Sequence, residues 1–175
     1  MIWVTRDYVH IDRVASPWLI KRFVDKRAQF IFLPKDEIAD FVTKTGAIPF
    51  DIAGVELTHH VCDGEKHCTF DAIVEKYVLE GDKALERVRK LVRAADHGEM
   101  DEEPLAWGLE VVSVGAPFLV DSDHEACEKE FPVYDMFYMY FKQQIIREKY
   151  KDEIGKFKTR EEGTIFIKQK LNESL

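Results

Sequence analysis

The segment from residue 2 to residue 33 decides the fold, because two apolar stretches enclose one amphipathic stretch there. In order, the three stretches are Ile2-Trp-Val-Thr5, Ile11-Asp-Arg-Val-Ala-Ser-Pro-Trp-Leu-Ile-Lys-Arg-Phe-Val24 and Gln29-Phe-Ile-Phe-Leu33. The outer two are short and rich in β-branched and aromatic residues, which is typical of strands. In the middle stretch, the apolar residues Val14, Trp18, Leu19 and Phe23 fall on one face of a helix. The segment therefore predicts a βαβ-like unit.

The rest of the chain predicts a second half rich in helices. A short helix is expected over residues 35–45, an extended segment over 48–59 and a polar loop over 60–68. Helices are expected over residues 69–79, 82–95, 105–120 and from 121 onward, and the aromatic residues of 131–141 are expected in the core. Because strands are expected only before Thr69, the fold class is α+β, with a small N-terminal sheet and a helix-rich second half. No repeat or linker divides the sequence, so we expect one domain over residues 1–175.

Composition and charge exclude several classes of protein. The 175 residues include 25 basic and 33 acidic side chains, which gives a net charge of −8, and 46% are hydrophobic, so the chain is not disordered. A negative surface repels phosphate backbones, so we expect no nucleic-acid binding by this chain alone. No stretch approaches the roughly 20 apolar residues of a membrane span, and the first residues lack a secretory signal. With only three cysteines, we expect a cytoplasmic protein without membrane association.

The junction after the first strand carries charged side chains that suit ligand binding. His10, Asp12 and Arg13 lie within four residues, where a helix also begins. His10 could ligate a metal ion through its neutral imidazole, Asp12 could orient that imidazole, and Arg13 could bind an oxyanion with two parallel hydrogen bonds. A purely structural interpretation is also open, in which Asp12 caps the helix and Arg13 pairs with it or with a surface carboxylate.

A second group of candidate ligands lies between residues 59 and 71, where the sequence places His59, His60, Cys62, His67, Cys68 and Asp71. The spacing contains no CxxC pair and matches no zinc finger or ribbon. If the loop returns as a hairpin, His59 and Asp71 could face one cleft and bind a divalent ion. For the other residues a surface loop with a buried Cys68 is the preferred interpretation. Asp96 stands at the end of a predicted helix, where a carboxylate needs a positive partner.

These segments resemble the chromate-resistance domain that forms the C-terminal half of a chromate-responsive regulator. The resemblance covers about residues 1–120, leaving residues 121–175 as a helical C-terminal extension. It is carried by five segments that occur in the order of the family: Trp3-Val-Thr-Arg6, His10-x-Asp-Arg-x-Ala-x-x-Trp-Leu-Ile-x-Arg-Phe23, Ala47-Ile-Pro-Phe-Asp51, Glu56-Leu-Thr-His59 and Cys68-Thr-Phe-Asp71. Because the matching segment begins at residue 2, we expect no counterpart of the half of the regulator credited with DNA binding, in agreement with the acidic charge.

The resemblance implies a role in chromate, oxyanion or metal stress and supplies a candidate site. We expect a divalent ion such as zinc, manganese or iron on His10, His59, Asp71 and Asp96, and a small oxyanion on Arg13 and Asp12. The leading hypothesis is a sensing or detoxifying module for a metal ion or oxyanion. A metal-dependent enzyme acting on a small anionic substrate is the alternative, and a non-catalytic interaction domain is a third interpretation. Catalytic turnover and dimerisation stay open at this stage.

Overall fold

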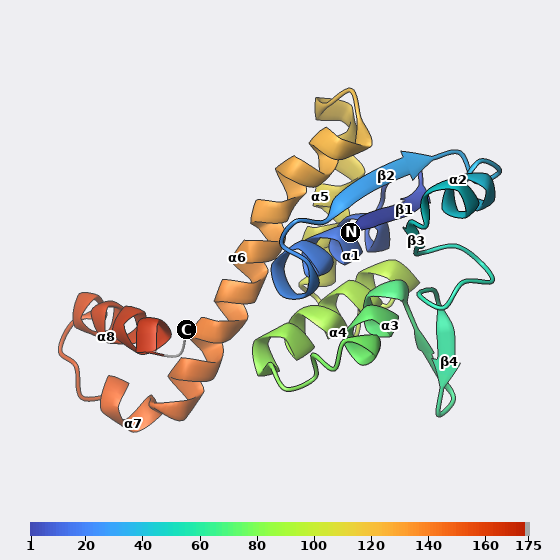
Figure 1. The fold of residues 1–175 in the computed structure, drawn as a ribbon. Helices are drawn as coiled ribbons and strands as arrows, with labels where there is room; N and C mark the ends of the chain where they lie inside the picture. Colours follow the sequence, from blue (N-terminus) through green and yellow to red (C-terminus); the bar gives the residue numbers. More distant parts are fainter. Residues whose placement is uncertain (174–175) are drawn as a thin grey trace.

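A computed structural model describes residues 1–173 of the chain. Three parallel strands form the N-terminal sheet in the order β2-β1-β3, with β1 spanning Ile2–Arg6, β2 Gln29–Leu33 and β3 Ile48–Pro49. β1 pairs with β2 along its whole length, from Ile2 opposite Gln29 to Arg6 opposite Leu33. The predicted βαβ unit is therefore confirmed, and Figure 1 shows the helix α1 beside these strands.

The amphipathic segment between β1 and β2 anchors the sheet to the helical half. It forms α1 (Asp12–Leu19) and continues as one turn of π-helix over Ile20–Val24. Trp18 is completely buried, and its ring stacks on the rings of Phe70 and Tyr134. Its indole N–H donates a hydrogen bond to Asp135 at 2.8 Å. Because Phe70 and Tyr134 belong to two later helices, this one side chain joins α1 to both of them.

The second half of the described chain consists of helices, as the sequence predicted. The bounds are α3 Thr69–Lys76, α4 Lys83–His97, α5 Ala106–Gly115, a 3-10 turn Ala116–Leu119, α6 Asp123–Lys149, α7 Lys151–Ile154 and α8 Arg160–Glu173. Within residues 1–173 all strands precede Thr69, so the α+β class is confirmed. Figure 1 shows α7 and α8 beyond the end of α6 that points away from the sheet. No helix of the described residues is long and apolar enough to span a membrane.

Residues 46–68 differ from the expectation. After α2 (Ile38–Thr45) the extended segment is reduced to β3 and one isolated bridge between Phe50 and Leu57. The expected polar loop is an antiparallel hairpin, with β4 over His60–Cys62 and β5 over Glu65–His67. The physical reason is the turn between these strands: Asp63 and Gly64 both have positive φ, at 51° and 84°. Asp-Gly is the preferred pair for such a two-residue hairpin turn.

The aromatic run on α6 contributes to the core only on one face. Tyr134 and Phe141 are buried, whereas Met136 and Tyr140 are 68% and 45% exposed. The face of α6 that carries Met136 and Tyr140 therefore packs little against the described residues. The expectation that this run is core is confirmed for the face that contacts α1 and α4.

Candidate metal and oxyanion site

The centre of the candidate site is His59, which lies just before β4. Its Nε2 atom is 3.4 Å from each of three carboxylate oxygens, contributed by Asp12, Asp51 and Asp96. These aspartates come from the start of α1, the segment after β3 and the last turn of α4. Residues distant in sequence therefore meet around one imidazole.

The backbone around two of these aspartates is in an uncommon conformation. Tyr8, Ile11 and Asp51 all have positive φ, at 59°, 21° and 52°. For a β-branched residue such as Ile11 this region is an outlier, because the side chain crowds the backbone. The surroundings hold the turn in place: Ile11 is fully buried, and the amides of Tyr8 and Val9 donate to the carboxylate of Asp123 at 3.0 Å. Strained turns of this kind cluster at functional sites.

Asp12 is fixed by the N-terminus of another helix. Its carboxylate accepts hydrogen bonds from the amides of Thr69 at 2.6 Å and Phe70 at 3.0 Å, in the first turn of α3. It also accepts one from the hydroxyl of Ser16 at 3.3 Å. The amides and the dipole of α3 favour a negative charge at this buried position. Asp12 thus does not cap its own helix, and the N-cap residue of α1 is Ile11.

Asp51 links the cluster to two arginines. One of its oxygens accepts from the hydroxyl of Thr69 at 3.0 Å, and the other lies 3.3 Å from Arg6 and 3.2 Å from Arg13. Burial alone would raise the pKa of this carboxyl. Hydrogen bonds from His59 and Thr69, together with the two guanidinium charges, outweigh burial and lower the pKa below its ordinary value. Asp51 is therefore a stable carboxylate within the cluster.

Asp96 has much weaker support. Its Oδ2 atom is buried and accepts no hydrogen bond, and the residue lies in the last turn of α4, where the helix dipole disfavours an anion. Burial, followed by the negative charge of Asp12, raises the pKa of Asp96 to about 7. Within the described chain, its only cationic neighbour within 4 Å is His59, and the imidazole of His97 lies 3.8 Å away. A buried oxygen without a donor is costly unless something else, such as a cation, contacts it.

The neighbouring carboxylates favour the protonated form of His59. Hydrogen bonds to Asp12 and Asp51 are the main cause that raises the pKa of His59 to about 10. An imidazolium thus occupies the point where the three carboxylates converge. If the imidazole loses this proton, its nitrogen becomes a ligand, and a divalent ion supplies the positive charge instead.

Two further side chains add donors at the edge of the cluster. Cys68 is completely buried, and its sulfur lies within 4.8 Å of ligand atoms of Asp12 and Asp96. Burial raises the pKa of the Cys68 thiol well above its ordinary value, so the thiol is neutral when no ion is bound. His97 forms a third group with His59 and Asp96, and burial lowers its pKa, which keeps its imidazole neutral. A set dominated by carboxylate and imidazole suits manganese, iron or zinc.

The structure brings together some of the predicted site residues and places others elsewhere. His59, Asp96 and Asp12 meet as described, and Arg13 reaches the cluster through Asp51 and donates to the carbonyl of Asp7 at 2.8 Å. His10 instead lies 3.4 Å from Glu110 on α5 and belongs to no group of candidate ligands in residues 1–173.

Asp71 lies on α3 but faces α4. Its two oxygens accept from the side chains of Arg89 and Arg93 and from the amide of Cys68 at 2.8 Å. Burial would raise the pKa of Asp71, but the two arginines lower it overall. All of its accepting capacity is used in this buried ion pair, so the geometry favours a structural position.

Sequence reasoning missed Asp51, Arg6 and His97. Asp51 ended one of the matching motifs, and this was its only signal. Arg6 is the last residue of β1, and parallel strands present their carboxyl ends to ligands at one edge of a sheet. For His97 the only signal was its position next to Asp96.

Comparisons with known proteins identify the family of this chain. The family model described as the C-terminal domain of ChrB matches residues 3–141, so the chain belongs to this family of chromate-resistance domains. Protein ChrB of Cupriavidus metallidurans is 30% identical over 139 residues, which are 79% of this chain and 40% of that relative. The chain thus spans well under half the length of this relative. No solved structure matches it.

Proposed function

We propose that this chain binds a divalent metal ion with Asp12, Asp51, His59 and Asp96, and a small oxyanion next to that ion, as a cytoplasmic sensing or detoxifying module in chromate resistance. The observation that carries the proposal is the buried Oδ2 atom of Asp96, which accepts no hydrogen bond and belongs to the three carboxylates that converge on His59. Such an arrangement is unfavourable in the protein alone, and a divalent cation would neutralise it.

The oxyanion part of the proposal rests on a cavity next to His59. This cavity has a volume of about 430 Å³, and its lining includes Arg6, Lys35, Asp51 and His59. Arg6 uses one nitrogen on Asp51 and its side chain remains 39% exposed, whereas that of Arg13 is only 19% exposed. Arg6 is therefore better placed than Arg13 to contact an anion, and Arg13 holds Asp51 in position.

A metal-dependent enzyme acting on a small anionic substrate is the second candidate, favoured by the same cavity. A bound ion would supply a water molecule of lowered pKa. His59 and Asp96 could hold or accept a proton beside it, and Arg6 and Lys35 could orient the anion. Turnover of an anionic substrate by the metal-loaded protein distinguishes this candidate from a binding module.

The first test is the metal content of protein purified without an affinity tag, followed by calorimetric titration of the chelator-treated protein with Mn²⁺ and Zn²⁺. We expect one Mn²⁺ ion bound by wild type at this site and none in the double variant His59→Gln/Asp96→Asn. Equal binding by both proteins would exclude this site. Chromate, sulfate and phosphate are then titrated into metal-loaded wild type, Arg6→Ala and Arg13→Lys. Arg6→Ala should lose oxyanion affinity with its metal content intact.

A further inference from the structure

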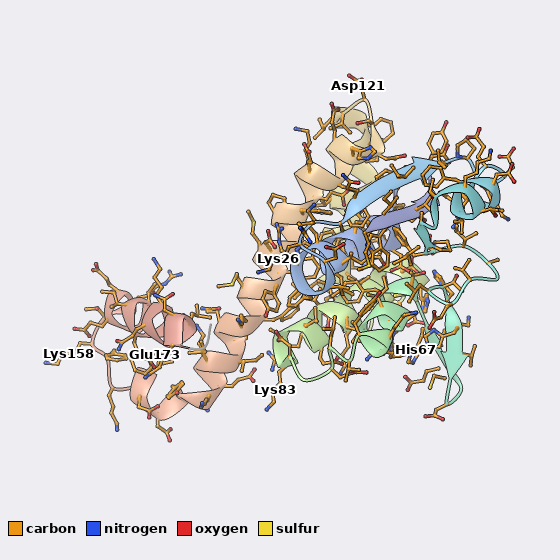
Figure 2. All side chains as sticks on the ribbon, in the orientation of Figure 1. Lys26, His67, Lys83, Asp121, Lys158 and Glu173 are labelled. Carbon is orange, nitrogen blue, oxygen red and sulfur yellow. The ribbon has the colours of Figure 1, made fainter. Side chains whose placement is uncertain are left out.

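A second group of ligand-bearing side chains lies on the β4–β5 hairpin, outside the site described above. In the hairpin His60 is paired with His67, and Cys62 is paired with Glu65. Side chains alternate between the two faces of a strand, so these four residues lie on one face, while Val61 and Lys66 lie on the other. The Asp63-Gly64 turn fixes this register. His67 lies where the hairpin approaches the helices (Figure 2).

Glu75 of α3 completes the group from the helical side. Its two carboxylate oxygens contact one imidazole each, at 3.0 Å from His60 Nε2 and 2.9 Å from His67 Nδ1. The centroids of the two imidazole rings are 4.9 Å apart. For comparison, ligand atoms about 2.0–2.1 Å from a tetrahedral zinc ion are about 3.3 Å from one another. Both nitrogen–oxygen distances are already close to this separation, and the three ligand atoms all lie within 4.8 Å of one another.

The contacts behind these ligand atoms also suit a metal ion. His60 Nδ1 faces the backbone carbonyl of Thr58 at 3.4 Å, and Glu75 accepts a hydrogen bond from Arg89. Metal-bound histidines usually donate their other N–H to a carbonyl or carboxylate, which leaves the opposite nitrogen free to ligate. The Arg89 contact holds the Glu75 carboxylate between the two rings. The side chain of His67 is only 11% exposed, so it has little freedom to turn away.

We propose that His60, His67 and Glu75 form a second metal site, which takes zinc or a similar borderline ion and fixes the hairpin to α3. Two imidazoles and one carboxylate leave a fourth position for water or for Cys62, which is exposed on the same face. Imidazole and thiolate are softer ligands than the carboxylates around His59, so the two sites differ in preference. This inference does not rest on the function proposed above.

The test uses the variant Asp96→Asn as background, which removes a ligand from the first site. Zinc is titrated calorimetrically into this protein, into the same protein with His60→Gln and His67→Gln, and into a matched control with Lys66→Gln on the opposite face of the hairpin. We expect one zinc equivalent in the background and control proteins, and at least about tenfold weaker binding after the two histidine substitutions. Equal zinc affinity in all three proteins would overturn the proposal.

A second measurement keeps the test decisive if the histidine variants fold poorly. The imidazole nitrogen resonances of the Asp96→Asn protein are followed by NMR as zinc is added. The signals of His60 and His67 should shift together at one equivalent, with the shifted nitrogen being Nε2 in His60 and Nδ1 in His67. Zinc that binds without shifting either ring would refute the site. Asp96→Asn leaves His60, His67 and Glu75 unchanged. Zinc binding at the second site can therefore be present or absent whether or not the first site binds a metal ion.

Discussion

Replacing Asp96 with asparagine should stabilise the metal-free protein and at the same time abolish its stabilisation by metal. In the folded chain the pKa of Asp96 is raised from 3.8 to about 7, mainly by burial. The folded state therefore holds this proton more tightly than the unfolded state does. The stability that the protonated Asp96 contributes is complete below about pH 4 and is lost as the pH rises through 7. Asparagine does not ionise, so it avoids this loss.

The magnitude follows from the difference between 3.8 and about 7. At 1.36 kcal/mol per pH unit, the ionised Asp96 costs at most about 4 kcal/mol. Because the positive charge of His59 offsets part of this cost, we expect a gain of about 2–4 kcal/mol in the free energy of unfolding for Asp96→Asn at pH 8, and almost none at pH 4. For a chain of this size that gain corresponds to roughly 4–15 °C in melting temperature.

The assay is thermal and urea unfolding of chelator-treated wild type and variant at pH 4 and pH 8, with and without Mn²⁺. An ion present at 100 times its dissociation constant stabilises wild type by about 2.7 kcal/mol, and this increase should disappear in the variant. The matched control is Asp101→Asn, which alters an exposed carboxylate in the connector after α4. A variant less stable than wild type at pH 8, or one with an undiminished response to Mn²⁺, would refute the reasoning.

Four further outcomes are expected. Asp71→Asn should lower the free energy of unfolding by about 1–3 kcal/mol, because it removes the buried carboxylate that pairs with Arg89 and Arg93. It should leave Mn²⁺ affinity unchanged in calorimetry, and a loss of affinity would make Asp71 a ligand. The unfolding free energy of metal-free wild type should fall between pH 5 and pH 10 in urea titrations, since the pKa values of Asp96 and His59 are both raised on folding. In His59→Gln the fall above pH 7 should be smaller, and an unchanged slope there would contradict the assignment. A gel-shift with duplex DNA at physiological salt should show no specific retention by this chain, and salt-sensitive retention would argue against the expectation from its charge of −8.

Part of the candidate site could be predicted from the sequence because its residues stand at the ends of recognisable elements. Asp12 begins a helix whose apolar spacing is plain, Asp96 closes another, and His59 ends a matching motif. A carboxylate at a helix C-terminus already indicated a missing positive partner. His10 carried a similar signal, but Glu110 of α5 lies beside it in the folded chain. Local sequence identifies the residues that can ligate, and it does not show which of them meet.

The sequence by itself determined the βαβ unit, the helical second half and the α+β class, because hydrophobic periodicity and turn residues act over a few positions. Only the tertiary structure decided that Asp51 joins the cluster, that Asp71 is held by the arginines of α4, and that His60 and His67 face Glu75. These contacts join residues up to 22 positions apart, and the cluster around His59 brings together Asp12 and Asp96, which are 84 positions apart. A carboxylate turns toward an arginine or toward an imidazole according to which charge lies within about 4 Å of it, and that distance is set by packing, not by position in the chain.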